Sequence, residues 1–96
     1  MEARPNTRVT VIGLGSIGSR HAQNLREMGV SVTGFDPDVK RRATVTASGI
    51  TTFPDRESAL AVSDAAIIAS PTPCHIDDLA AAIEANCHAL VEKPLG

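Results

Sequence analysis

The feature that most constrains this chain is a glycine-rich stretch that directly follows an apolar run at residues 9–12, and it reads Gly13-Leu-Gly-Ser-Ile-Gly18. Between a strand and a helix, the spacing G-x-G-x-x-G is typical of loops that bind the pyrophosphate of a dinucleotide. We expect Gly13 to make the tight turn, Gly15 to let phosphates approach the backbone, and Gly18 to let the helix pack closely. The spacing alone is weak evidence, because glycine-rich turns are common, and the downstream sequence must support it.

A helix is predicted to begin at Ser16, directly after this turn. The first backbone N–H groups of a helix have no partner inside it, and the helix dipole favours negative charge beside them. The amides of Ser16, Ile17 and Gly18 are therefore candidate phosphate ligands. His21 lies one turn further on, on the side expected to face the core, and we assign it a structural role.

The composition is that of an ordinary globular chain, with 96 residues, 43% of them hydrophobic and 21% charged. This length is enough for one small domain. The net charge is −2, and the only cluster of basic residues is Lys40-Arg41-Arg42. With two Phe and no Tyr or Trp, the chain also lacks stacking platforms. These features disfavour nucleic-acid binding, which depends on clustered cations and aromatic rings.

Membrane and metal sites are also disfavoured by the sequence. No apolar run approaches the roughly 20 residues that span a bilayer, and the N-terminus has no apolar core of a signal peptide. The two cysteines, Cys74 and Cys87, do not indicate a disulfide framework, and neither has metal-ligand companions at a usable spacing. We therefore expect a cytoplasmic protein with no metal.

Strand and helix patterns alternate along the whole chain. The patterns predict strands at residues 9–12, 30–35, 50–53, 65–69 and 88–91, with helices at 16–28, 37–47 and 56–62 and a fourth opening at Thr72-Pro73. Such alternation requires a parallel sheet with helices on both faces, because each crossover is right-handed. We expect a Rossmann-type doubly wound α/β fold of about five strands in the order 3-2-1-4-5.

Two details of the fourth helix can be predicted from its residue types. Thr72 is expected to cap this helix, and Pro73 to occupy its first position. Its apolar face is expected to comprise Ile76, Leu79, Ala80 and Ile83.

Asp36 stands at the end of the second predicted strand. An acid there can accept hydrogen bonds from the adenosine ribose hydroxyls and repels the extra phosphate of NADP, so NAD is expected rather than NADP. The alternative role is a helix N-cap, with Pro37 in the first helical position. The run at residues 40–42 either pairs with a 2′-phosphate or forms a solvated helix face, and we favour the solvated face.

Two further stretches end at the same predicted edge of the sheet. Ligands of open α/β sheets bind beyond the carboxyl ends of the strands, so Ser70, Pro71, Thr72 and His75 are candidates to line the ribose and nicotinamide. The alternative is a rigid turn that contacts no ligand.

The second stretch is Glu92-Lys93-Pro94, after the fifth strand. Lys93 could donate a hydrogen bond to a hydroxyl or carbonyl under conversion, and move a proton if burial lowers its pKa. The alternative is a solvated charge pair.

Three linked motifs together resemble one family. They are Gly-Leu-Gly-Ser-Ile-Gly-Ser-Arg-His, Ala-Ser-Pro-Thr-Pro-Cys-His and Val-Glu-Lys-Pro-Leu. In this order and spacing they resemble the Gfo/Idh/MocA oxidoreductases over essentially the whole chain. The resemblance implies an NAD(P)-binding Rossmann domain, with hydride transfer at a hydroxyl-bearing carbon of a sugar or cyclitol. It also implies pyrophosphate binding at Gly13, Gly15 and Gly18, ribose binding at Asp36, and contact of Glu92 and Lys93 with cofactor and of Lys93 with substrate.

Members of this family carry a second domain that holds the substrate pocket, and the Rossmann domain continues with a further helix and strand. Residues 1–96 therefore resemble an N-terminal fragment, expected to bind cofactor weakly without turnover. The alternative is a non-catalytic NAD sensor, which has no need of the Glu92-Lys93-Pro94 triplet. A fifth strand without an outer neighbour would expose an apolar edge, which predicts self-association.

Overall fold

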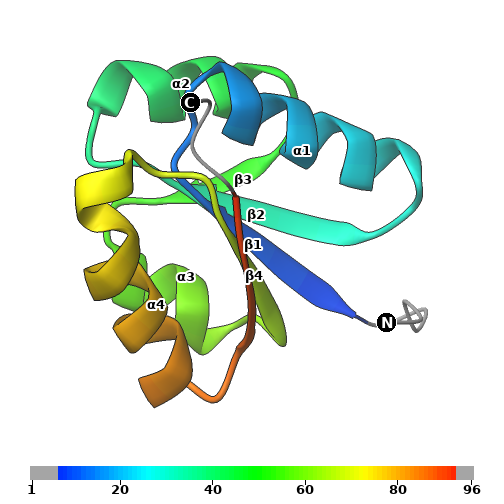
Figure 1. Ribbon diagram of the computed structural model, residues 1–96. Helices are drawn as coiled ribbons and strands as arrows, with labels where there is room; N and C mark the ends of the chain where they lie inside the picture. The colour runs from blue at the N-terminus through cyan, green and yellow to red at the C-terminus, as the bar shows by residue number, and fades with distance from the viewer. Residues whose placement is uncertain (1–6, 93–96) are drawn as a thin grey trace.

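Helices cover both faces of a five-stranded parallel sheet in the computed structural model, which describes residues 7–92 (Figure 1). The strands are β1 (Arg8–Ile12), β2 (Ser31–Phe35), β3 (Thr51–Phe53), β4 (Ala65–Ile68) and β5 (His88–Val91). The helices are α1 (Ser16–Glu27), α2 (Val39–Ala47), α3 (Arg56–Ala61) and α4 (His75–Glu84), with a 3-10 helix, η1 (Thr72–Cys74), before α4. Within residues 7–92, no helix has both the length and the apolar character needed to cross a membrane.

The strand order is β3-β2-β1-β4-β5, and every neighbouring pair is parallel. This confirms the Rossmann-type order expected from the sequence. The central strand β1 pairs with β2 on one side and with β4 on the other, so the chain reverses its direction of winding there. In doubly wound sheets this reversal opens a crevice at the carboxyl ends of the strands.

Two apolar layers hold the helices to the sheet. Figure 1 shows α1 and α2 on one face and α3 and α4 on the other. Val11 of β1 is fully buried under the first pair, with Leu14, Ala22, Val45 and Ile50. Ile12 points to the opposite face, where it packs with Leu60, Ala66, Ile68, Ala82 and Cys87. Burial of each large aliphatic side chain contributes roughly 1.5–3 kcal/mol, so both layers are needed for stability.

Helix α4 differs from its sequence prediction in both its start and its buried face. It begins at His75 without a side-chain cap, and Pro71 rather than Thr72 is the N-cap of the preceding η1. Of the four residues predicted for its apolar face, Ile76, Ala80 and Ile83 are exposed and only Leu79 is half-buried, whereas Asp78 is buried. The reason is an ion pair between Asp78 Oδ1 and Arg56 Nη1 at 3.0 Å, which holds the acidic side of α4 against α3.

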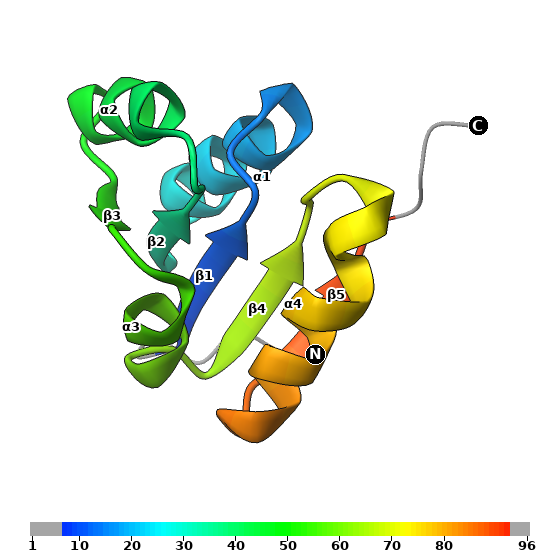
Figure 2. The same ribbon diagram turned by 90° about the vertical axis from the view of Figure 1, so that its left-hand side faces the viewer.

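Strand β5 forms one edge of the sheet, next to β4 (Figure 2). All four of its residues are exposed, and Leu90 is 61% exposed. The sequence His-Ala-Leu-Val contains no acidic residue, lysine, arginine or proline that would protect an edge strand from pairing.

Candidate functional site

A cleft of about 420 Å³ lies at the carboxyl ends of the central strands. It is lined by Gly13, Gly15, Ser16, Ile17, Asp36, Arg41, Ala69, Ser70, Pro71, Thr72, His75 and Glu92. The fold thus brings together every predicted cofactor residue except Gly18 and Lys93. Gly18 is buried beneath the loop, and Lys93 lies outside the described residues.

The glycine loop is shaped by two close backbone approaches. Gly13 has a φ of +98°, a conformation that side chains disfavour, and its N–H donates to Phe35 O at 2.8 Å. A Cβ placed on Gly18 would lie 1.7 Å from Gly13 O, so only glycine fits there. A Cβ on Gly15 would meet only Arg41 Nη1, at 3.9 Å. The loop is therefore tight at Gly13 and Gly18 and open at Gly15.

The start of α1 faces this open side of the loop, and its first amides have no hydrogen-bond acceptor among residues 7–92. Its N-cap is Gly15, whose carbonyl accepts the first helical hydrogen bond from Ser19 N at 2.8 Å. A glycine cap has no side chain to bind the amides of Ser16, Ile17 and Gly18, which an α-helix leaves without internal partners. Because the helix dipole adds positive potential, this part of the cleft is suited to an anion.

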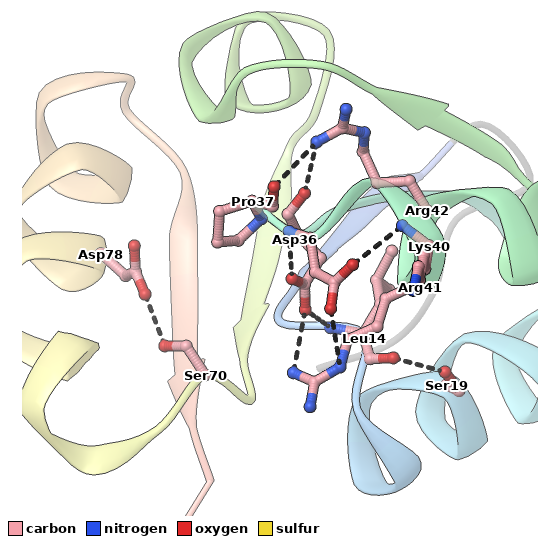
Figure 3. A network of polar contacts seen from close by, with 10 residues as sticks. Leu14, Ser19, Asp36, Pro37, Lys40, Arg41, Arg42, Ser70 and Asp78 are labelled. Atoms are coloured by element: carbon pink, nitrogen blue, oxygen red, sulfur yellow. Dashed lines mark hydrogen bonds and ion pairs between the residues drawn. The ribbon is translucent and has the colours of Figure 1, made fainter.

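Asp36 is 4% exposed and holds the loop in place (Figure 3). Its Oδ2 accepts a hydrogen bond from Leu14 N, and its Oδ1 accepts one from Asp38 N, both at 2.8 Å. The predicted N-cap role is wrong, because Asp38 caps α2 by accepting from Lys40 N, and the helix begins at Val39 rather than at Pro37. The Asp36 carboxylate is directed toward the glycine loop instead.

Arg41 lines the cleft, although the sequence favours a solvated helix face for residues 40–42. Its Nη1 lies 3.7 Å from Asp36 Oδ2, and its Nε lies 4.0 Å from Asp38 Oδ2. Arg42 turns to the backbone, where its Nη1 donates to Asp36 O at 2.8 Å. The position of Arg41 in the first turn of a helix that starts beside Asp36 is the sequence signal that could have identified it.

The turn after β4, residues 69–74 (the β4 turn), is held by hydrogen bonds between Ser70 and two side chains of α4. His75 Nε2–H donates to Ser70 O at 2.6 Å, and Ser70 Oγ–H donates to Asp78 Oδ2. Asp78 also pairs with Arg56, and this hydrogen bond is the main reason that the pKa of the Arg56 guanidinium is raised. These hydrogen bonds fix the turn as one wall of the cleft, and its contact with a ligand stays a prediction.

The glycine loop and the β4 turn are in direct contact. A Cβ on Gly13 would lie 2.5 Å from Ser70 N, so the two backbones pack without a side chain between them. One continuous surface therefore runs from the start of α1 to the β4 turn. Among residues 7–92 no three His, Cys, Asp or Glu side chains are grouped so that they could hold a metal ion.

Glu92 completes the cleft at the end opposite Asp36 and is held by His21. The carboxylate can only accept, so His21 Nε2–H donates to Glu92 Oε1, at 2.9 Å. The sequence predicts a structural role for His21 but does not reveal this partner, because the two residues are 71 positions apart.

Comparison with known families gives a match over almost the whole chain. The model of an oxidoreductase family with an NAD-binding Rossmann fold, GFO_IDH_MocA, matches residues 7–96. UDP-N-acetylglucosamine 3-dehydrogenase of Acidithiobacillus ferrooxidans is 36% identical over 88 residues, which are 91% of this chain and 28% of that protein. Inositol 2-dehydrogenase of Mycolicibacterium smegmatis is 35% identical over 95 residues, which cover 92% of this chain and 28% of that protein.

Solved structures show the same fold. The A. ferrooxidans enzyme superposes with a TM-score of 0.87 at 35% identity, over 93% of this chain and 29% of that one. A probable dehydrogenase from Thermotoga maritima gives a TM-score of 0.82 at 30% identity, over 93% and 28%. The chain thus spans less than a third of the length of each of these relatives.

Proposed function

Since this chain belongs to the Gfo/Idh/MocA oxidoreductase family and has its NAD-binding Rossmann fold, we propose that its cleft binds a nicotinamide dinucleotide for hydride transfer. The observation that carries the proposal is the single continuous cleft that joins the start of α1, Asp36 and the β4 turn. A dinucleotide has an anionic centre between two ribose-bearing halves, and the cleft offers an anion site with polar groups on both sides.

The pyrophosphate is assigned to the amides at the start of α1, beside the open Gly15. The adenosine ribose is assigned to Asp36, because each carboxylate oxygen has a second lone pair besides the one used by the backbone N–H. The nicotinamide half is assigned to the other end, where Ser70, His75 and Glu92 line the cleft.

NAD is the preferred form of the cofactor in this proposal. A nearly buried carboxylate at Asp36 repels the 2′-phosphate of NADP. Arg41 lies 3.7 Å from that carboxylate and reduces the repulsion, so the preference is moderate rather than absolute. The two free cysteines, Cys74 and Cys87, support a reducing compartment such as the cytoplasm.

The longer enzyme of which such a domain is a part is proposed to act on a sugar or cyclitol. The two relatives, a UDP-N-acetylglucosamine 3-dehydrogenase and an inositol 2-dehydrogenase, support this substrate class by the substrates in their names. When bound, the nicotinamide ring would supply hydride transfer. Lys93 is proposed to hydrogen-bond the substrate hydroxyl and to assist in moving its proton.

Titration of the 96-residue chain with NADH, followed by nicotinamide fluorescence and by calorimetry, tests the binding proposal. We expect a saturable change with weak affinity, at submillimolar to millimolar concentration, and weaker binding of NADPH. The variant Ile83→Ser is the matched control, because this exposed residue of α4 does not line the cleft. If neither heat nor fluorescence changes at millimolar NADH, the proposal is wrong.

A further inference from the structure

Glu92 is attached to the rest of the fold at two points. Its backbone N–H donates to Ile68 O at 2.9 Å, which extends the pairing of β4 and β5 by one residue. Its carboxylate accepts the hydrogen bond from His21 at 2.9 Å. The side chains of His21 and Glu92 are only 32% and 35% exposed, so water screens this contact less than a fully exposed pair.

The contact joins two parts of the cleft that come from distant parts of the sequence. His21 lies in the second turn of α1, whose first turn forms the anion site of the cleft. Glu92 lines the end of the cleft that is opposite Asp36. Within the described residues, it is the one side-chain hydrogen bond that links α1 to β5 or to Glu92.

We propose that His21 is a positioning residue, which holds Glu92 at the nicotinamide end of the cleft. The proposal rests on the proposed function for its effect on cofactor binding.

This role predicts a loss that depends on which part of the cofactor is present. ADP-ribose contains the pyrophosphate and the adenosine half but lacks the nicotinamide. Removal of the His21 side chain would leave the amides at the start of α1 and Asp36 unchanged, because within residues 7–92 the side chain of His21 hydrogen-bonds to neither. Binding of NADH should therefore weaken while binding of ADP-ribose should persist.

The experiment compares His21→Ala, His21→Gln and Gln23→Ala with the unaltered chain. Glutamine places an amide N–H close to the position of Nε2, so it restores the donor without an imidazole. Gln23→Ala is the matched control, because Gln23 lies on the same helix but bonds Ser48 Oγ, away from the cleft. Affinities for NADH and ADP-ribose are measured, together with amide exchange at Glu92 and at Val11 in the ligand-free chain.

We expect His21→Ala to bind NADH about fivefold more weakly and ADP-ribose within twofold of the unaltered chain, in line with the loss of about one hydrogen bond. Exchange at Glu92 should accelerate at least fivefold, with Val11 unchanged, and His21→Gln should restore both values. An equal loss for both ligands, equal acceleration at both amides, or no change at Glu92 would overturn the positioning role. If the unaltered chain binds neither ligand, the proposed function fails, and the exchange data alone decide whether His21 positions Glu92.

Discussion

The buried carboxylate of Asp36 accepts a hydrogen bond from the backbone N–H of Leu14 at 2.8 Å, and thereby ties the end of β2 to the glycine loop after β1. Asp36, which is assigned to the cofactor ribose, thus also holds the glycine loop that shapes the anion site of the cleft. A change at Asp36 must affect both stability and cofactor choice, and the two effects can be separated by the choice of substitution.

Asp36→Ala should lower the free energy of unfolding by about 2–3 kcal/mol, because it leaves the buried amide of Leu14 without its charged acceptor. Asp36→Asn keeps an oxygen that can accept this hydrogen bond, so it should cost less stability. Both variants remove the negative charge and should raise the affinity for NADPH relative to NADH about tenfold. Urea unfolding and parallel titrations measure the two effects. An unchanged NADPH to NADH ratio in Asp36→Asn would contradict the ribose assignment.

Gly15 and Gly18 should respond to substitution in opposite ways. Gly15 has a φ of −68° and open space at its Cβ position, so Gly15→Val should fold with near-normal stability. Its side chain would occupy the approach of the phosphates, and NADH binding should fall at least tenfold. Gly18→Ala places a methyl group 1.7 Å from Gly13 O and should unfold or severely destabilise the chain. Circular dichroism and NADH titration check both expectations. Normal NADH binding by folded Gly15→Val would place the phosphates elsewhere.

The fold was predictable from the sequence because each element carries its own pattern. The continuous apolar run of β4 and the glycines that begin and end the helices specify alternating strands and helices, and alternation with right-handed crossovers specifies the sheet. The tight turn at Gly13 and the packing of Gly18 followed from residue type alone, since only glycine tolerates those positions.

What the sequence could not show depends on partners that are distant along the chain. Asp78 is buried because Arg56 and Ser70 reach it from α3 and from the β4 turn, and no periodicity within α4 reveals these partners. The pair of His21 and Glu92 likewise exists only once the sheet has formed. Asp38 rather than Asp36 is the N-cap of α2, because the Asp36 carboxylate accepts a hydrogen bond from the Leu14 amide. This too is a contact between two loops.

Acid should destabilise the chain in a predictable range of pH. Hydrogen bonds from Ser58 lower the pKa of Asp55 below its ordinary 3.8, and those from Arg8 do the same for Asp64. A lowered folded-state pKa stabilises the fold fully above the unfolded-state value, and this contribution is lost as pH falls through the folded-state pKa. The urea concentration at which half of the chain is unfolded should therefore decrease when the pH is lowered below about 4. Asp55→Asn keeps the N-cap acceptor but cannot titrate, so its midpoint should fall less between pH 4 and pH 2.5. A decline identical to that of the unaltered chain would exclude Asp55 as a contributor.

The exposed edge of β5 should lead the 96-residue chain to associate with a second copy. Leu90 is 61% exposed on a strand with no charged carboxylate, lysine or arginine, and its outer backbone groups have no neighbouring strand within residues 7–92. We expect sedimentation to show a concentration-dependent dimer. Leu90→Lys should shift the chain to monomer, because pairing would place two lysines at the shared edge. Met28→Lys, an equally drastic change at an exposed residue at the end of α1, should leave the dimer intact. A monomer at all concentrations, with slow amide exchange at Leu90 and Val91, would show that the edge is stable without a partner copy.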